Sequence, residues 1–542
     1  MSGYSNLEKL RGAILAQETG TLLKSGYCPC EVGLAALSPY PVAMSSLGFQ
    51  TVYRIFNSLP EVRCERLFLL GRGGLDKAGE WLSLESGRKA GEFKVLAASI
   101  SYEQETLMLP RALAAAGIPL YAAERGEGAP VVICGGPVIT ANPEPLAPFI
   151  DVCAIGDSER LAPDFAALWL EAFSRGWPRQ RLLEELAARE GFYIPALYET
   201  RPEKGPYPVA PFPASGRAPA TVRRAVNSRL DPPAHSAIVS DTTHFKRMFM
   251  VEVARGCRWN CRFCLVCRVN RPYRPVPAER VIEALSRAPR QARSAGLVGA
   301  NLCDHPELEA ILEAAAARGL RLGISSLRVD TVSRSLLELL KKCGVGGLTL
   351  APETASAELL SRIGKRYSRE RLFEVVELMS REGFESLKLY YMIGLPGESR
   401  ADREELARQI RELAACAGTG MKLKVSLNPF VPKPQTAWQD ESMFRPGEIK
   451  AAIRQLRRDL SGPGARVELQ AGSPAEAVAQ AVISLGDRTL AAPLARAAVE
   501  PGERFLDCLD EAGVELDPLL YKRKKPAELH PWRVLECEPS IS

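Results

Sequence analysis

Short apolar runs alternate with segments of helical periodicity along most of the chain. In residues 30–195, four apolar runs each lead into a glycine, a serine or a polar turn, which is typical of buried parallel strands. These runs are 66–70, 94–100, 131–134 and 150–155. Residues 105–116 and 160–174 have the periodicity of helices. This order predicts a doubly wound α/β domain, whose ligand site lies at the carboxyl ends of the strands.

The second half of the chain repeats strand–helix units more regularly. The six predicted strands are 248–253, 297–301, 320–325, 347–351, 386–393 and 422–427. The helices predicted between them include 278–286, 307–318, 333–342, 369–381 and 403–415. Six such units predict a parallel barrel two units short of the eightfold one. We expect this partial (β/α)6 barrel to be open at its side, where a large substrate can enter.

These patterns divide the chain into five expected parts. Residues 1–29 form an N-terminal helical segment, and 30–200 form the doubly wound domain. Residues 201–245 form a linker, because eight prolines fall between 201 and 233 without clear periodicity. The barrel occupies 246–460, and 461–542 form a small C-terminal domain without a readable motif.

The composition is that of a globular protein, with 46% hydrophobic and 25% charged residues. A net charge of +6 argues only weakly for an anionic partner, and we predict no nucleic-acid site. No apolar run is long enough to span a bilayer, and the N-terminus lacks the features of a signal peptide. The expected location is therefore cytoplasmic.

Four of the fourteen cysteines fall within eleven residues. Residues 254–264 read Ala-Arg-Gly-Cys-Arg-Trp-Asn-Cys-Arg-Phe-Cys, so that Cys257, Cys261 and Cys264 follow the first barrel strand. Thiolates are the usual ligands of iron–sulfur clusters, and three ligands leave the fourth iron of a cubane open to a small molecule. The alternative is a structural zinc site, which usually has a second pair of ligands. Cys267 offers only one more, and a fourth protein ligand would close the open iron.

The spacing of three and then two residues between the cysteines resembles that of the radical SAM superfamily. The resemblance implies a 4Fe–4S cluster whose open iron chelates S-adenosylmethionine, and it extends to later stretches of the barrel. There it implies contacts to S-adenosylmethionine from Phe263, Arg328, Glu353, Lys388 and Gly394. Glu353 stands among apolar residues and needs a partner, which the ammonium of the ligand could supply.

The first half resembles the Rossmann-like cobalamin-binding domain that precedes the barrel in many of these enzymes. The residues that the resemblance assigns to cobalamin are Ser45, Gly48, Ser99, Ser101, Tyr102, Gly135, Gly136, Pro137, Gly156 and Glu159. No histidine precedes His235, so we expect cobalamin, if it binds, to have no histidine as its lower ligand. Alternatively, the domain binds nothing.

These resemblances imply a methyltransferase. The favoured reaction methylates an unactivated carbon by means of a 5′-deoxyadenosyl radical and methylcobalamin. The alternatives are a radical cyclisation or rearrangement, a radical SAM enzyme without cobalamin, and an iron–sulfur electron-transfer or sensor protein. The expected electron donor is a flavodoxin or a ferredoxin. The substrate stays open among small molecules, lipids and protein side chains.

Overall fold

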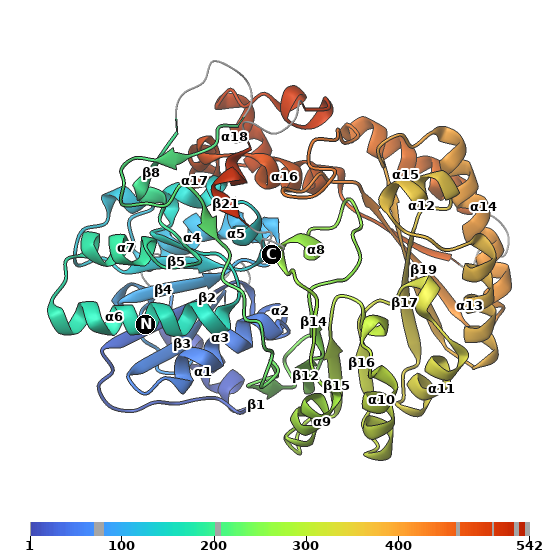
Figure 1. Ribbon diagram of the computed structural model, residues 1–542, viewed down its shortest axis with the longest axis horizontal. Helices are drawn as coiled ribbons and strands as arrows, with labels where there is room; N and C mark the ends of the chain where they lie inside the picture. Colours follow the sequence, from blue (N-terminus) through green and yellow to red (C-terminus); the bar gives the residue numbers. More distant parts are fainter. Residues whose placement is uncertain are drawn as a thin grey trace.

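The structure, a computed structural model, describes residues 2–69, 81–200, 208–461, 467–500, 503–524 and 530–536. Figure 1 shows a doubly wound domain in blue to teal beside a barrel in green to orange, with red C-terminal helices along the edge between them. Within the described ranges, no helix has both the length and the apolar character needed to cross a membrane.

A six-stranded sheet forms the doubly wound domain, in the order β3-β2-β4-β5-β6-β7. Its strands are β2 (Cys30–Pro39), β3 (Val62–Leu69), β4 (Val95–Ser99), β5 (Val131–Gly135), β6 (Val152–Ala154) and β7 (Phe192–Tyr193). All pairs are parallel except β6–β7. Helices α3 (Leu47–Ser58) and α6 (Ser158–Arg175) pack against each other, whereas α4 (Met108–Ala116) and α5 (Pro137–Ala141) belong to the other layer. The predicted strands are confirmed with small shifts of their ends.

Two parallel sheets form the open barrel. The first holds β12 (Met248–Glu252), β15 (Ser294–Val298) and β16 (Leu322–Ile324). The second holds β17 (Gly347–Glu353), β18 (Ser386–Ile393), β19 (Lys422–Pro429) and β20 (Val467–Ala471). A parallel bridge from Leu327, just beyond β16, to Leu350 of β17 joins them. Five of the six predicted strands are confirmed with small shifts of their ends, whereas the one predicted at 297–301 lies three residues earlier, at 294–298. Strand β20 adds a seventh that the sequence did not predict.

Helices cover the outside of the barrel. They are α9 (Ala278–Ser286), α10 (Leu308–Ala317), α11 (Arg334–Lys342), α12 (Ala357–Ile363), α13 (Arg369–Arg381), α14 (Arg400–Ala417) and α15 (Pro446–Leu460). Burial alternates along β18, and buried Tyr391 donates a hydrogen bond to Gln409 of α14 at 2.8 Å. Because side chains alternate along a strand, Lys388, Tyr390 and Met392 face the barrel interior.

The C-terminal helices connect the two halves. Helices α16 (Pro474–Leu485), α17 (Ala491–Val499) and α18 (Phe505–Glu511) follow β20, and α17 packs on α4. The Asn142 amide donates to the carbonyl oxygens of Ser484 at 3.0 Å and Gly486 at 2.9 Å. One hydrophobic core extends from α4 through these helices into the barrel, so the two halves pack as one body.

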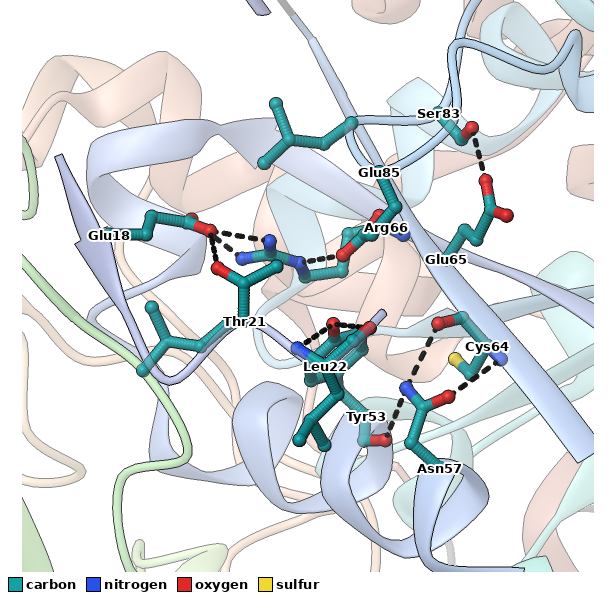
Figure 2. A network of polar contacts seen from close by, with 12 residues as sticks. Glu18, Thr21, Leu22, Tyr53, Asn57, Cys64, Glu65, Arg66, Ser83 and Glu85 are labelled. Carbon is teal, nitrogen blue, oxygen red and sulfur yellow. Dashed lines mark hydrogen bonds and ion pairs between the residues drawn. The ribbon is translucent and has the colours of Figure 1, made fainter. Parts of the chain in front are cut away.

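A buried ion network fastens the N-terminal segment to the doubly wound domain. Figure 2 shows the Arg66 guanidinium between two carboxylates. Glu18 accepts two hydrogen bonds at 2.7 Å and Glu85 accepts one at 2.6 Å. Glu18 lies on β1 (Glu18–Thr19), a short strand that pairs with β11 (Val239–Ser240), near the end of the linker. The network therefore ties both ends of the domain to its edge strand β3.

Candidate cofactor sites at the domain junction

The three clustered cysteines lie on one loop whose two ends are held together. The short strands β13 (Ala254–Arg255) and β14 (Arg274–Pro275) pair on either side of it. Gly256 has a φ of +81°, and a Cβ there would lie 2.5 Å from the carbonyl oxygen of Asn270. Cys257, Cys261 and Cys264 are only partly buried. We call residues 256–273 the cysteine loop.

The surroundings of Cys264 favour its thiolate. The pKa of Cys264 is lowered to about 6 by a hydrogen bond from the Cys267 thiol and by backbone N–H groups of Cys267 and Val266, against the effect of burial. Cys267 is buried, and its sulfur also lies 3.0 Å from the carbonyl oxygen of Cys264. Its pKa is raised by the same hydrogen bond, so it is a protonated donor beside the loop. In the described part of the chain, no three His, Cys, Asp or Glu side chains converge as ligands of a single metal ion would. A cubane instead places each thiolate on its own iron.

Unpaired polar atoms lie beside the cysteine loop, past the end of β15. Asn301 is 6% exposed, and neither its side-chain oxygen nor its nitrogen has a hydrogen-bond partner among the described residues. Asp304 accepts a hydrogen bond from Trp259 at 2.9 Å through one oxygen, whereas its other oxygen is buried and unpaired. The Tyr273 hydroxyl is also buried and unpaired, and burial with the nearby charge of Asp304 raises its pKa to about 12. Buried polar groups need partners, so this site suits a polar ligand.

Glu353 has a partner within the protein. Its carboxylate takes a protein partner, the Lys365 ammonium at 2.7 Å, and so needs no ligand ammonium. Arg328 likewise forms a fork on Asp330, with both distances 3.0 Å, and stacks 3.8 Å from the Trp259 ring centre. Both charged groups therefore have protein partners, and Arg328 contacts the cysteine loop through Trp259.

Three further residues assigned to S-adenosylmethionine lie on the cysteine loop and on or next to β18. Phe263 packs on the hydrophobic core beside the cysteines. The Lys388 ammonium lies 4.9 Å from the Tyr390 ring centre on the interior face of β18. Gly394 follows that strand with a φ of +75°, and a Cβ there would lie 3.0 Å from the Phe444 ring. The structure therefore spreads these residues from the cysteine loop to β18.

A narrow apolar cleft lies at the carboxyl ends of the strands of the doubly wound domain. It brings together Ser99, Gly135, Gly136 and Gly156 of the predicted cobalamin set. Its full lining is Leu34, Val52, Phe56, Ala97, Ala98, Ser99, Ile133, Gly135, Gly136, Ala154, Gly156, Ser158, Leu161 and Ala162. The floor is built of glycine, alanine and serine, and the walls are larger apolar side chains of α3 and α6. A flat apolar group can therefore approach the ends of the strands closely.

The remaining residues predicted for cobalamin do not line this cleft. Ser45 accepts a hydrogen bond from the His244 backbone at 3.0 Å, and Gly48 is exposed on α3. Ser101, Tyr102 and Pro137 follow lining residues in the sequence, with Tyr102 40% exposed. Glu159 is turned away from the cleft and pairs with Arg255, next to the cysteine loop.

Two family models match this chain. A model described as radical SAM proteins, N-terminal, matches residues 48–195, and one described as the radical SAM superfamily matches residues 251–410. Together they span more than half of the chain, and the second contains the three cysteines. The chain belongs to the radical SAM superfamily.

Known proteins resemble this radical SAM chain over different lengths. An uncharacterised protein of Methanocaldococcus jannaschii is 25% identical over 365 residues, which are 66% of this chain and 72% of that protein. Hopanoid C-3 methylase of Methylococcus capsulatus is 30% identical over 228 residues, 39% of this chain and 41% of the methylase. This chain thus matches about two fifths of that enzyme.

Among solved structures, the radical S-adenosylmethionine methyltransferase TsrM of Kitasatospora setae, with cobalamin and a 4Fe–4S cluster bound, is similar. The TM-score is 0.52 at 14% identity, covering 77% of this chain and 75% of TsrM. This likeness shows that the two proteins share a fold, with a doubly wound domain before a radical SAM barrel.

Sequence reasoning missed Asn301, Asp304 and Lys365. Asn301 was assigned to the end of a strand, but β15 ends at Val298, so Asn301 and Asp304 lie beyond the strand. A polar residue directly after a buried strand was the available signal. No sequence signal could pair Glu353 with Lys365, because helix α12 lies between them in the chain and its placement brings the two side chains together.

Proposed function

We propose that this protein is a cobalamin-dependent radical SAM enzyme that methylates an unactivated carbon. One observation carries the proposal: the apolar cleft and the cysteine loop adjoin, because the turn after β6 contributes to both. Residues 156 and 158 line the cleft, and residues 157 and 159 bind the base of the loop. When bound, the cluster with S-adenosylmethionine supplies a 5′-deoxyadenosyl radical, and the corrin supplies the methyl group.

The residues around the cysteine loop fit the first pair of cofactors. Cys257, Cys261 and Cys264 would hold the cluster, and Cys267 would donate a hydrogen bond to a sulfur ligand without binding iron. Asn301, Asp304 and Tyr273 would bind polar groups of S-adenosylmethionine, since their unpaired atoms face no protein partner. Such a site orients its ligand by hydrogen bonds that the empty protein lacks.

The cleft fits the apolar edge of a corrinoid. Its small floor residues leave room at the ends of the strands, whereas Val52, Phe56 and Leu161 supply apolar contact. No histidine lies in the first 234 residues, so no imidazole of this domain can ligate cobalt. Tyr102 is exposed near the cleft, where it would shield the lower face from water.

Corrin binding tests this proposal. Protein supplied with hydroxocobalamin is expected to retain about one corrin per chain. The Ala162→Phe variant, which fills the cleft, is expected to retain little. Its matched control is Ala167→Phe, on the exposed face of the same helix, which should bind like the wild type. Circular dichroism and iron content show whether each variant is folded. A wild-type protein without corrin contradicts methyl transfer and leaves a radical SAM enzyme that works without cobalamin.

A further inference from the structure

One turn of the doubly wound domain faces two sites with alternating residues. Gly156 and Ser158 line the apolar cleft. Asp157 and Glu159, the residues between and after them, instead bind two arginines that flank the cysteine loop. The turn is therefore shared by a ligand cleft and by the base of the loop that carries the cysteines.

Arg255 is the centre of the contacts on the loop side. Its guanidinium donates to the two carboxylate oxygens of Glu159 at 2.6 and 3.0 Å, and to both oxygens of Glu252 at 2.7 and 2.8 Å. It also lies 3.2 Å from Asp157. Only Gly256 separates Arg255 from Cys257, the first cysteine of the loop. Because three carboxylates bind it, the planar guanidinium of Arg255 has little freedom to rotate.

Arg274 completes the bridge from the opposite end of the loop. It donates to Asp157 and to the carbonyl oxygen of Asn227, and it pairs with Arg255 across β13 and β14. Burial would raise the pKa of Asp157, but Arg255 and Arg274 outweigh it and the pKa is lowered. We call Asp157, Glu159, Glu252, Arg255 and Arg274 the junction bridge.

The backbone of the turn packs closely against Ala225, so its residues move together. Gly156 has a φ of +130°, and a Cβ there would lie 2.1 Å from the carbonyl oxygen of Ala225. The Asp157 N–H donates to that same oxygen at 2.9 Å. A displacement at Gly156 or Ser158 is therefore passed to Asp157 and Glu159, since packed elements move as units.

We propose that the junction bridge couples the cleft to the cysteine loop, with Asp157 and Glu159 as positioning residues and not as cofactor ligands. This inference rests on the proposed function. A ligand in the cleft shifts the turn, and the bridge transfers the shift to Arg255 and hence to the orientation of the loop. The cleft ligand and S-adenosylmethionine then change each other's affinity.

The test measures the dissociation constant of S-adenosylmethionine on cluster-reconstituted protein, with and without hydroxocobalamin. In the wild type we expect the two constants to differ by about fivefold or more, the lower end of typical coupling between sites. The affinity for hydroxocobalamin should change by the same factor when S-adenosylmethionine is added, because coupling is reciprocal. The electron paramagnetic resonance signal of the reduced cluster should also shift when corrin binds.

Glu159→Gln keeps the shape of the side chain but removes its charge. We expect it to retain corrin and iron and to reduce the ratio of the two constants to less than about twofold, whereas Glu159→Asp should restore part of the ratio. The control is Glu190→Gln. Glu190 is an exposed ion partner of Arg160, the residue after Glu159 on α6, and this variant should behave like the wild type. If Glu159→Gln does not fold, Arg255→Lys, which loses the fork but keeps the charge, should lose the coupling.

Two outcomes overturn the inference alone: a wild-type ratio near one, or the same ratio in wild type and Glu159→Gln, each with full corrin and iron. Absence of corrin from the wild type overturns the proposed function and this inference together.

Discussion

Glu103 and Lys433 form a buried ion pair, although 330 residues separate them in the chain. Glu103 lies beyond β4 in the doubly wound domain, and Lys433 lies beyond β19 in the barrel. Ser484 of α16 donates to the same carboxylate at 2.9 Å, and Gln480 donates at 3.1 Å. One carboxylate therefore joins the doubly wound domain, the barrel and the C-terminal helices.

Removing Lys433 should destabilise the junction. Lys433→Ala leaves the Glu103 charge buried without its ion partner, a change that costs about 3 kcal/mol or more in comparable cases. Thermal unfolding should show a lower melting temperature, whereas Arg445→Ala, which breaks an exposed pair with Asp517, should leave it unchanged. Equal melting temperatures for the two variants would contradict the assigned role.

The same pair predicts a pH dependence. Burial would raise the pKa of Glu103, but Lys433 outweighs it and the pKa is lowered. A lowered carboxyl pKa means that the stabilisation is complete above the ordinary pKa of glutamic acid and is lost as the pH falls through the folded value. The stability difference between wild type and Glu103→Gln should therefore shrink on acidification of the apoprotein.

Two glycines assigned to cobalamin from the sequence should respond differently to alanine. At Gly156 the backbone is left-handed and a Cβ would collide with Ala225, so Gly156→Ala should lower both the melting temperature and the corrin content. Gly48 is in the first turn of α3, and only Ser46 Oγ, at 3.8 Å, is near its Cβ position. Gly48→Ala should be neutral or slightly stabilising, because alanine favours helix. A loss of corrin in Gly48→Ala would show that the cleft extends to α3's first turn.

Asn301 should bind ligand without contributing to cluster assembly. Asn301→Leu keeps the branching of the side chain and removes both unpaired polar atoms, so position 301 no longer offers hydrogen bonds. The affinity for S-adenosylmethionine should fall about tenfold, which corresponds to a loss of hydrogen bonding of about 1.4 kcal/mol. Iron content should stay at the wild-type level. Unchanged affinity in a folded, iron-loaded variant would remove Asn301 from the site.

The cysteines should divide into two classes. Replacing Cys257, Cys261 or Cys264 by alanine should remove the brown absorption of the cluster, since each would bind a separate iron. Cys267→Ala should retain it, because that thiol is a protonated donor to the loop. Absorption spectra after anaerobic reconstitution distinguish the classes, and loss of the cluster in Cys267→Ala would make that residue a ligand.

Hydrophobic patterning was sufficient for most of the fold. The strand prediction at 386–393 coincides with β18, because its side chains alternate between the helices and the interior. In contrast, β2 was not predicted although it is an interior strand of its sheet. Its Gly33, Ala35 and Ala36 have little intrinsic preference for a strand, so pairing with β3 and β4 determines its conformation. Strand β20 was also missed: it has only five residues, and its pairing with β19 sets its position.

The site was predictable where one short segment carries it and not where distant segments meet. The spacing of Cys257, Cys261 and Cys264 is a local signal. The contact of Glu159 with Arg255 joins residues 96 positions apart, and only the packing of two domains brings them together. The sequence therefore assigned Glu159 to a cofactor, whereas in the structure it anchors the cysteine loop.

Formation of 5′-deoxyadenosine is the most direct test of the account. Anaerobically reconstituted wild-type protein, given dithionite and S-adenosylmethionine, should release it, and Cys261→Ala should release none. Wild-type protein that holds its cluster and binds S-adenosylmethionine but forms no 5′-deoxyadenosine would contradict the account.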